Sequence, residues 1–155
     1  MPQMNKGGKF IFGESAIRPD GLVQFPPQAA EEYRIASEGR VYLFTGSKVT
    51  GSFCVTRQGL LLPSKLGHIL TETPALLNYG ASEGRFLPYK GRAYCWTVIS
   101  EIGEIRLTDE MMAFLGLESG ARLLSIRSSD IAFTMGAKGP LMEKSEHFDG
   151  EIPIF

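Results

Sequence analysis

Short runs of apolar residues alternate with turn-forming residues along almost the whole chain. Runs rich in β-branched, aromatic and leucine side chains, bounded by Gly, Pro, Asn or Asp, predict β-strands. We expect strands over residues 9–13, 22–25, 40–45, 51–56, 92–100, 104–107, 121–127 and 131–137. Apolar positions and helix-starting residues between these runs predict short helices over residues 28–33, 64–70, 73–79, 111–115 and 138–147. The pattern therefore predicts a mainly β protein with short helices.

The same order of elements occurs twice. When the sequence is compared with itself at an offset of 82 positions, residues 16–53 fall without a gap on the stretch that begins at Val98. The identical pairs are Ile17/Ile99, Gly21/Gly103, Ser37/Ser119, Arg40/Arg122 and Ser47/Ser129. Apolar residues also meet apolar residues, as at Val23/Ile105, Phe25/Leu107, Ala29/Met111 and Tyr33/Leu115.

Self-similarity at a fixed offset indicates a duplicated unit, here of β-β-α-β-β order. We expect a flexible N-terminus over residues 1–8 and a first repeat over residues 9–79. A connection over residues 80–90 then leads to a second repeat over residues 91–155. Both halves are expected to form one pseudo-symmetric domain.

A second, shorter self-similarity occurs at an offset of 79 positions, where Lys65, His68 and Glu72 align with Lys144, His147 and Glu151. His68/Glu72 and His147/Glu151 have i, i+4 spacing, which on a helix would place each pair on one face and allow a metal site. Histidines beside apolar residues are more often packed or capping groups. We favour that interpretation and predict no metal ligands.

Composition and charge narrow the functional classes. The chain has 155 residues, of which 43% are hydrophobic and 21% charged, and its net charge is -1. This balance excludes a protein whose whole surface contacts phosphates, although a local basic patch stays possible. Cys54 and Cys95 are expected to be buried free thiols in a reducing cytosol. Because there is neither a signal-peptide pattern nor an apolar run of membrane-spanning length, we expect a cytoplasmic protein without a membrane partner.

The second unit carries a family resemblance. Its residues 103–110 (GEIRLTDE), 115–120 (LGLESG) and 122–126 (RLLSI) resemble the AbrB/SpoVT/MazE family. The first unit carries the same resemblance in residues 21–26 (GLVQFP) and 33–35 (YRI), and Pro26 matches a proline common in the family, whereas Thr108 departs from it. The resemblance implies a swapped-hairpin barrel, which in the family is usually a DNA-binding homodimer. A tandem copy implies that one chain supplies both halves, as in the related cradle-loop barrels.

The same comparison weakens the expectation of DNA binding. In the family, contacts to DNA come mainly from basic residues just after the glycine and early in the helix. At these positions this chain has Leu22, Ala30 and Glu31 in the first unit and Glu104, Met112 and Ala113 in the second. Losing a Lys or Arg contact to phosphate weakens binding and lowers its salt dependence.

Other cations remain as candidate nucleic-acid contacts. Arg85, Lys90 and Arg92 alternate with Phe86, Tyr89 and Tyr94, an arrangement that suits nucleic acid. The alternative, which we favour, is a solvated linker with ordinary surface charges. The predicted nucleic-acid contacts are Arg18, Lys48, Arg85, Lys90, Arg92 and Arg106.

Turns and one helix start are candidate anion sites. Backbone N–H groups at a helix start or tight turn can hold an anion, although helix capping and hairpin turns explain the same residues and are favoured. The candidates are Ser47, Lys48, Ser128, Ser129, Lys138 and Gly139.

No nucleophile, phosphate-loop or zinc-spacing motif is present, so we expect no enzyme and no cofactor. Our first hypothesis is an AbrB/SpoVT-like transcriptional regulator with altered DNA contacts. The alternatives are a barrel that binds a small anionic ligand such as a phosphate or nucleotide, and an oligomerisation module suggested by Phe148 and Phe155. The protein would be a monomeric pseudo-dimer or a homodimer.

Overall fold

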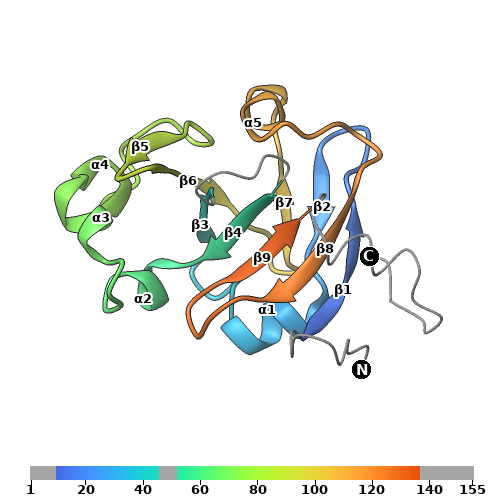
Figure 1. Ribbon diagram of the computed structural model, residues 1–155, viewed down its shortest axis with the longest axis horizontal. Coiled ribbons are helices and arrows are strands. Elements are labelled where there is room, and N and C mark those ends of the chain that lie inside the picture. Colours follow the sequence, from blue (N-terminus) through green and yellow to red (C-terminus); the bar gives the residue numbers. More distant parts are fainter. Residues whose placement is uncertain (1–9, 46–51, 137–155) are drawn as a thin grey trace.

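In a computed structural model of the protein, residues 10–45 and 52–136 are described. These residues form a mainly β fold with short helices (Figure 1). The strands are β1 (Ile11–Ala16), β2 (Leu22–Gln24), β3 (Arg40–Phe44), β4 (Ser52–Thr56), β5 (Leu87–Tyr89), β6 (Arg92–Val98), β7 (Glu104–Arg106), β8 (Arg122–Arg127) and β9 (Phe133–Gly136). The helices are α1 (Pro27–Tyr33), α2 (Gln58–Leu61), α3 (His68–Glu72), α4 (Pro74–Leu77) and α5 (Asp109–Leu115).

Seven of these strands form one antiparallel sheet in the order β1-β8-β9-β4-β3-β6-β5. The remaining two, β2 and β7, pair with each other as a separate two-stranded ribbon. Strands distant in sequence are therefore neighbours: β1 pairs with β8, and β3 pairs with β6. Each predicted half supplies strands that complete the other half's pairing.

The expected closed barrel is not formed by the described residues. The seven-stranded sheet is open, with β1 and β5 at its edges. β3 pairs with one edge of β6, and the short β5, which the sequence pattern did not predict, pairs with residues 92–94 on the other edge.

Two hydrophobic cores lie on opposite faces of the sheet. Along β3, Val41 and Leu43 belong to the first core and Tyr42 and Phe44 to the second, since successive side chains of a strand point to opposite faces. The first core packs β2, β7, α1 and α5 against the sheet. The second lies under α2, α3 and α4, which form the left-hand lobe in Figure 1. Among the described residues, no helix is long and apolar enough to cross a membrane.

Most predicted elements are confirmed within one or two residues, including α1, β3, β4, β7, β8 and α5. Thr108 caps α5 as expected: its Oγ1 accepts a hydrogen bond from the Met111 amide at 3.2 Å, and Asp109 and Glu110 occupy the first turn. The first strand begins later and extends to Ala16. The predicted helix over residues 64–70 is wrong in position, because helical structure occurs instead at α2 and α3. The helix expected over residues 138–147 lies outside the described residues.

The missed strand β5 contains Pro88, which donates no hydrogen bond and is normally confined to strands at sheet edges. Residues 80–90 were expected to be an irregular connection, because they are polar and glycine-containing. The two-residue turn between Tyr89 and Arg92 brings β5 beside β6, whereas the order of apolar and polar residues within β5 does not predict a strand.

Candidate functional site

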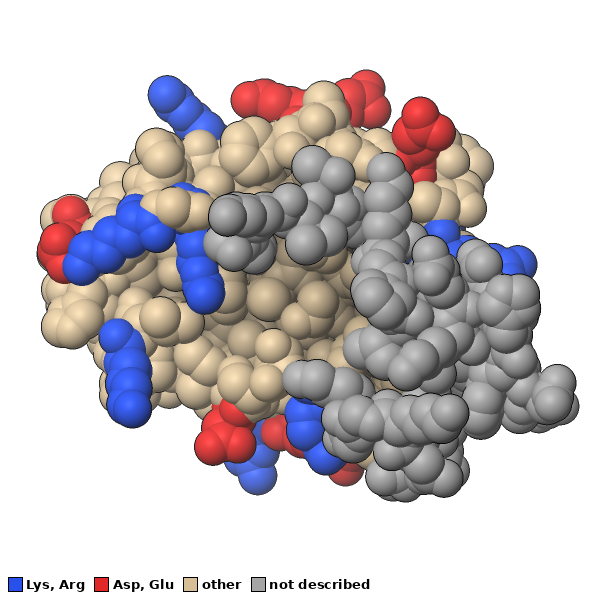
Figure 2. Space-filling view, viewed as in Figure 1, with Lys and Arg blue, Asp and Glu red and all other residues tan. Residues whose placement is uncertain are grey.

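A pocket of about 160 Å³ lies where the segment leading into α3 meets the β5–β6 hairpin. Lys65 and Leu66 come from the loop before α3, and His68 is the first residue of that helix. The opposite wall consists of Tyr89, Lys90, Arg92 and Tyr94. Figure 2 shows Lys and Arg side chains gathered at the left-hand end of this face, where Figure 1 places α3, α4 and β5.

The β5–β6 turn fixes the cations of the second wall. Lys90 and Gly91 both have positive φ, 47° and 79°, and Tyr89 is paired with Arg92 across the turn. Positive φ at both central residues is the conformation of the two-residue hairpin turns that match strand twist. The turn therefore places Lys90 at the tip of the hairpin and Arg92 at the start of β6.

Aromatic rings support two of the cations. The Nζ of Lys90 lies 5.2 Å from the centroid of the Tyr89 ring, and the Cζ of Arg92 lies 5.8 Å from that of Phe44. Phe44 is itself stacked on Tyr94, with centroids 5.2 Å apart. Cations are attracted to ring faces at such distances, so these contacts hold the charges in place.

Both tyrosines of the pocket retain their protons. The Tyr89 hydroxyl donates a 2.6 Å hydrogen bond to Oε2 of Glu72, and this bond raises the pKa of Tyr89. Burial raises the pKa of Tyr94, although the neighbouring Arg92 acts in the opposite direction. Of the described residues that line the pocket, none is Asp or Glu, so Lys65, Lys90 and Arg92 supply its charge.

The structure brings together only some of the predicted nucleic-acid contacts. Lys90 and Arg92 share the pocket, whereas Arg85 does not line it. Beside Arg85, Phe86 stacks on the exposed Phe114 of α5 at a centroid distance of 4.4 Å. Lys48 lies outside the described residues.

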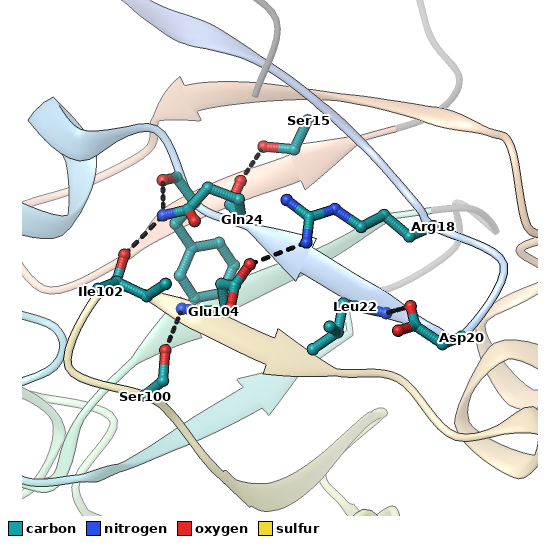
Figure 3. Close-up of polar contacts among 9 residues, drawn as sticks. Ser15, Arg18, Asp20, Leu22, Gln24, Ser100, Ile102 and Glu104 are labelled. Carbon is teal, nitrogen blue, oxygen red and sulfur yellow. Dashed lines mark hydrogen bonds and ion pairs between the residues drawn. The ribbon is translucent and has the colours of Figure 1, made fainter.

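Arg106 belongs to β7 and is paired with Leu22 of β2. Arg18 lies beside this ribbon (Figure 3). Nη1 of Arg18 is 3.0 Å from Oε2 of Glu104, an ion pair that offsets the arginine charge. Gln24 donates to the Ile102 carbonyl at 2.6 Å, and the Glu104 amide donates to Ser100 Oγ at 3.0 Å. Polar groups on this side of the ribbon thus bond mainly to one another.

Of the residues predicted to bind an anion, Ser128 and Ser129 are among those that the structure describes. Ser128 and Ser129 lie in the β8–β9 turn, where the Ser129 amide donates to the Ala132 carbonyl at 3.0 Å and Ser129 Oγ accepts from the Ile131 amide at 3.3 Å. The Ser129 carbonyl accepts from the Tyr33 hydroxyl at 2.6 Å. These bonds are those of a stabilised hairpin turn. Ser47, Lys48, Lys138 and Gly139 lie outside the described residues, as do Phe148 and Phe155.

Sequence reasoning missed Lys65 and His68 as members of the pocket. His68 and Glu72 do lie on one helix, but Glu72 is bonded to Tyr89, and His68 faces the cationic pocket. No group of three or more His, Cys, Asp or Glu residues suited to a metal is found in the part of the chain that the structure describes. His147 and Glu151 lie outside it. Cys95 is buried and Cys54 partly buried, both as free thiols.

A larger open hollow runs along α1, where its described lining is Gln28, Glu31, Glu32 and Arg34. Its described wall comes from one helix and its turn, and Glu32 is already paired with Arg127. The smaller pocket has walls from two separate segments, and its described lining carries three cations and no carboxylate, so it is the better candidate site.

Comparison of the chain with protein-family models and with curated protein sequences gave no match.

Proposed function

We propose that this protein is a non-enzymatic binding protein, built on a tandem AbrB/SpoVT-like unit, that holds a small anionic ligand in the pocket between α3 and the β5–β6 hairpin. The observation that carries the proposal is the convergence of Lys65, Lys90 and Arg92 on one pocket whose described lining contains no carboxylate. Like charges held together raise the free energy of the empty site, and a bound anion would relieve that repulsion.

The arrangement of the elements supports a tandem unit. β2, α1 and β3 recur as β7, α5 and β8 with starting residues 82 positions apart, and β1 recurs as β6 within one residue of that offset. In the order β1-β8-β9-β4-β3-β6, each strand can be replaced by its counterpart in the other half: β1 by β6, β8 by β3 and β9 by β4. The replacement gives the same order read backwards. This is the pattern expected for two related units around a pseudo-twofold axis.

Equivalent hydrogen bonds support the same axis at the β2–β7 ribbon. The Phe25 amide donates to the Gly103 carbonyl at 2.9 Å, and the Leu107 amide donates to the Gly21 carbonyl at 2.8 Å. The axis would run through the paired Val23 and Ile105. A swapped-hairpin ancestry accounts for this symmetry, while the open seven-stranded sheet departs from the family's barrel.

The pocket lies mostly outside the repeated elements. Its first wall and the tip of its hairpin belong to the segment between β4 and β6, which contains α2, α3, α4 and β5. The proposed binding function would thus be an addition to the duplicated framework and would not need the family's usual DNA contacts.

Titration calorimetry with inorganic phosphate, sulfate and citrate at low ionic strength tests the proposal. We expect at least one of these anions to bind, and Arg92→Gln to weaken its binding roughly tenfold or more, since a hydrogen bond to a charged group contributes about 1.5–3 kcal/mol. Arg106→Gln is the matched control, because Arg106 is exposed on β7 away from the pocket and the charge change is the same. Equal affinities for both variants, or no binding of any of the anions, would refute the pocket as the site.

Duplex DNA is the second candidate ligand, favoured by the cations that gather on the same end of the molecule (Figure 2). DNA binding through phosphates must weaken as salt rises, and each lost contact reduces the slope by about one. The double variant Lys65→Gln/Lys90→Gln should therefore bind random duplex DNA with a shallower salt dependence. Absence of DNA binding at low ionic strength would exclude this candidate.

A further inference from the structure

We infer that the ligand of the pocket is a phosphomonoester, an inference that rests on the proposed anion-binding function. The phosphate group would belong to a small metabolite or to the phosphorylated end of a longer molecule. Three features of the pocket point to this class: its excess of charge, its arginine and its combination of size and lining.

The charge of the site matches a dianion. Lys65, Lys90 and Arg92 supply three positive charges, and the Glu72 carboxylate is held beside the site by its bond to Tyr89. Three cations against one carboxylate leave an excess of two positive charges. A phosphomonoester carries about -1.5 to -2 charges near pH 7, whereas a carboxylate or a phosphodiester carries a single charge.

Arg92 is suited to a phosphate because of how it is held. Its guanidinium lies over the Phe44 ring at 5.8 Å and beside Tyr94, whose pKa it lowers against the effect of burial. A guanidinium presents several donors in a fixed plane, which match two oxygens of one phosphate. Lys90 from the same hairpin and Lys65 from the opposite wall add flexible donors.

Size and lining indicate what is attached to the phosphate. A volume of about 160 Å³ is below the roughly 300–1,000 Å³ typical of pockets that enclose drug-sized ligands. The site therefore encloses a phosphate and a small adjoining group, while any larger remainder extends into solvent. Leu66, Tyr89 and Tyr94 offer apolar and aromatic surface to that adjoining group.

Phenyl phosphate and its methyl diester are probes that share the ring and differ in charge. At pH 7.5 and low salt, we expect calorimetry on the full chain to show the monoester binding roughly tenfold more tightly, because it brings one additional negative charge close to the three cations. Equal affinities for monoester and diester would overturn this inference while leaving anion binding intact. Failure of every anion to bind would instead refute the proposed function.

Variants locate the discrimination in the pocket. Lys90→Gln changes an exposed side chain at the hairpin tip, so the fold should be retained, and circular dichroism verifies this. We expect Lys90→Gln and Arg92→Gln to reduce the ratio of monoester to diester affinity, and Arg106→Gln to leave it unchanged. An unchanged ratio in both pocket variants would contradict the inference.

Two single-stranded oligothymidylates, one with a 5′-phosphate and one with a 5′-hydroxyl, distinguish a small metabolite from the phosphorylated end of a longer molecule. Tighter binding of the phosphorylated strand, lost in Arg92→Gln, would identify the end of a nucleic acid as a source. If phenyl phosphate binds and both strands bind equally weakly, the inference holds with a small metabolite as the ligand.

Discussion

Tyr42 shows how a single residue joins the helical lobe to the sheet. Its side chain is among the largest of those that are fully buried. Its hydroxyl donates to the Leu76 carbonyl of α4 at 2.8 Å and accepts from Gln58 Nε2 of α2 at 3.1 Å. Because the lobe supplies Lys65 and His68, this contact also supports one wall of the pocket.

Replacing Tyr42 by Phe should lower the free energy of unfolding by about 1–3 kcal/mol, because the Leu76 carbonyl would lose its buried partner. Urea denaturation measures the change. Tyr89→Phe is the control, since its hydroxyl bonds to Glu72 in an exposed contact and its removal should have much less effect. Equal effects of the two substitutions would contradict the role assigned to Tyr42.

A buried thiol and a buried tyrosine hydroxyl should make the folded protein less stable in alkali. Burial raises the pKa of Cys95 from 9.0 to about 12 and that of Tyr33 from 10.0 to about 12. Above pH 9 the unfolded chain therefore binds fewer protons than the folded one, so stability decreases as pH rises. This stabilisation is complete below pH 9 and is lost progressively between pH 9 and 12.

We therefore expect the urea midpoint to be independent of these two groups up to pH 8 and to fall from pH 9 to 11. Cys95→Ala should show a shallower fall, because one of the buried groups with a raised pKa is removed. A midpoint that stays constant over this range in the unmodified protein would contradict the buried, protonated state of the thiol.

At the scale of elements, the ribbon of β2 and β7 depends on two turn glycines that play unequal roles. Gly21 and Gly103 have φ of +85° and +83°, a region that other residues occupy at a cost. A Cβ on Gly21 would lie 2.2 Å from the Leu107 carbonyl oxygen, whereas one on Gly103 would meet only atoms at 3.6 Å. Related turns thus leave different space for a side chain.

Gly103→Ala should destabilise the protein by about 1–2 kcal/mol, the approximate cost of left-handed backbone for a residue with a Cβ. Gly21→Ala should destabilise it more, because the backbone at Leu107, directly after β7, must also move. Urea midpoints of the two variants compare them directly. A larger effect at Gly103 would show that the close approach of Gly21 to Leu107 is not maintained in solution.

At the scale of the whole molecule, the two halves depend on each other. Phe133 of β9 packs with ring centroids 5.2 Å from Phe25 and 5.3 Å from Tyr33, both contributed by the first half. The pairs β1–β8 and β3–β6 also join the halves. If either half unfolded, the other would lose these strand partners.

Unfolding in urea should therefore be a single transition, with the fluorescence of Trp96 and far-UV circular dichroism changing together. Phe133→Ala should lower the free energy of unfolding by about 3–5 kcal/mol and shift both signals equally. Two separated transitions, or a shift in only one signal, would indicate that the halves unfold independently.

The sequence by itself determined most strand positions, the helices α1 and α5, the Thr108 cap and the turn glycines Gly21 and Gly103. These features depend on residues close together in the chain. Alternation reports which face of a strand is buried, and a cap or a tight turn needs a particular residue at a particular position.

Only the tertiary structure decided the open sheet, the pairing of Arg18 with Glu104 and the meeting of Lys65 with Lys90. The sequence indicated Lys90 and Arg92 together because they are neighbours, but it gave no signal that α3 would approach their hairpin. Contacts between distant segments depend on strand register and on the path of the chain, and no local pattern of residues encodes either. The physical reason is that a charge acts on whatever lies near it in space, irrespective of its distance along the chain.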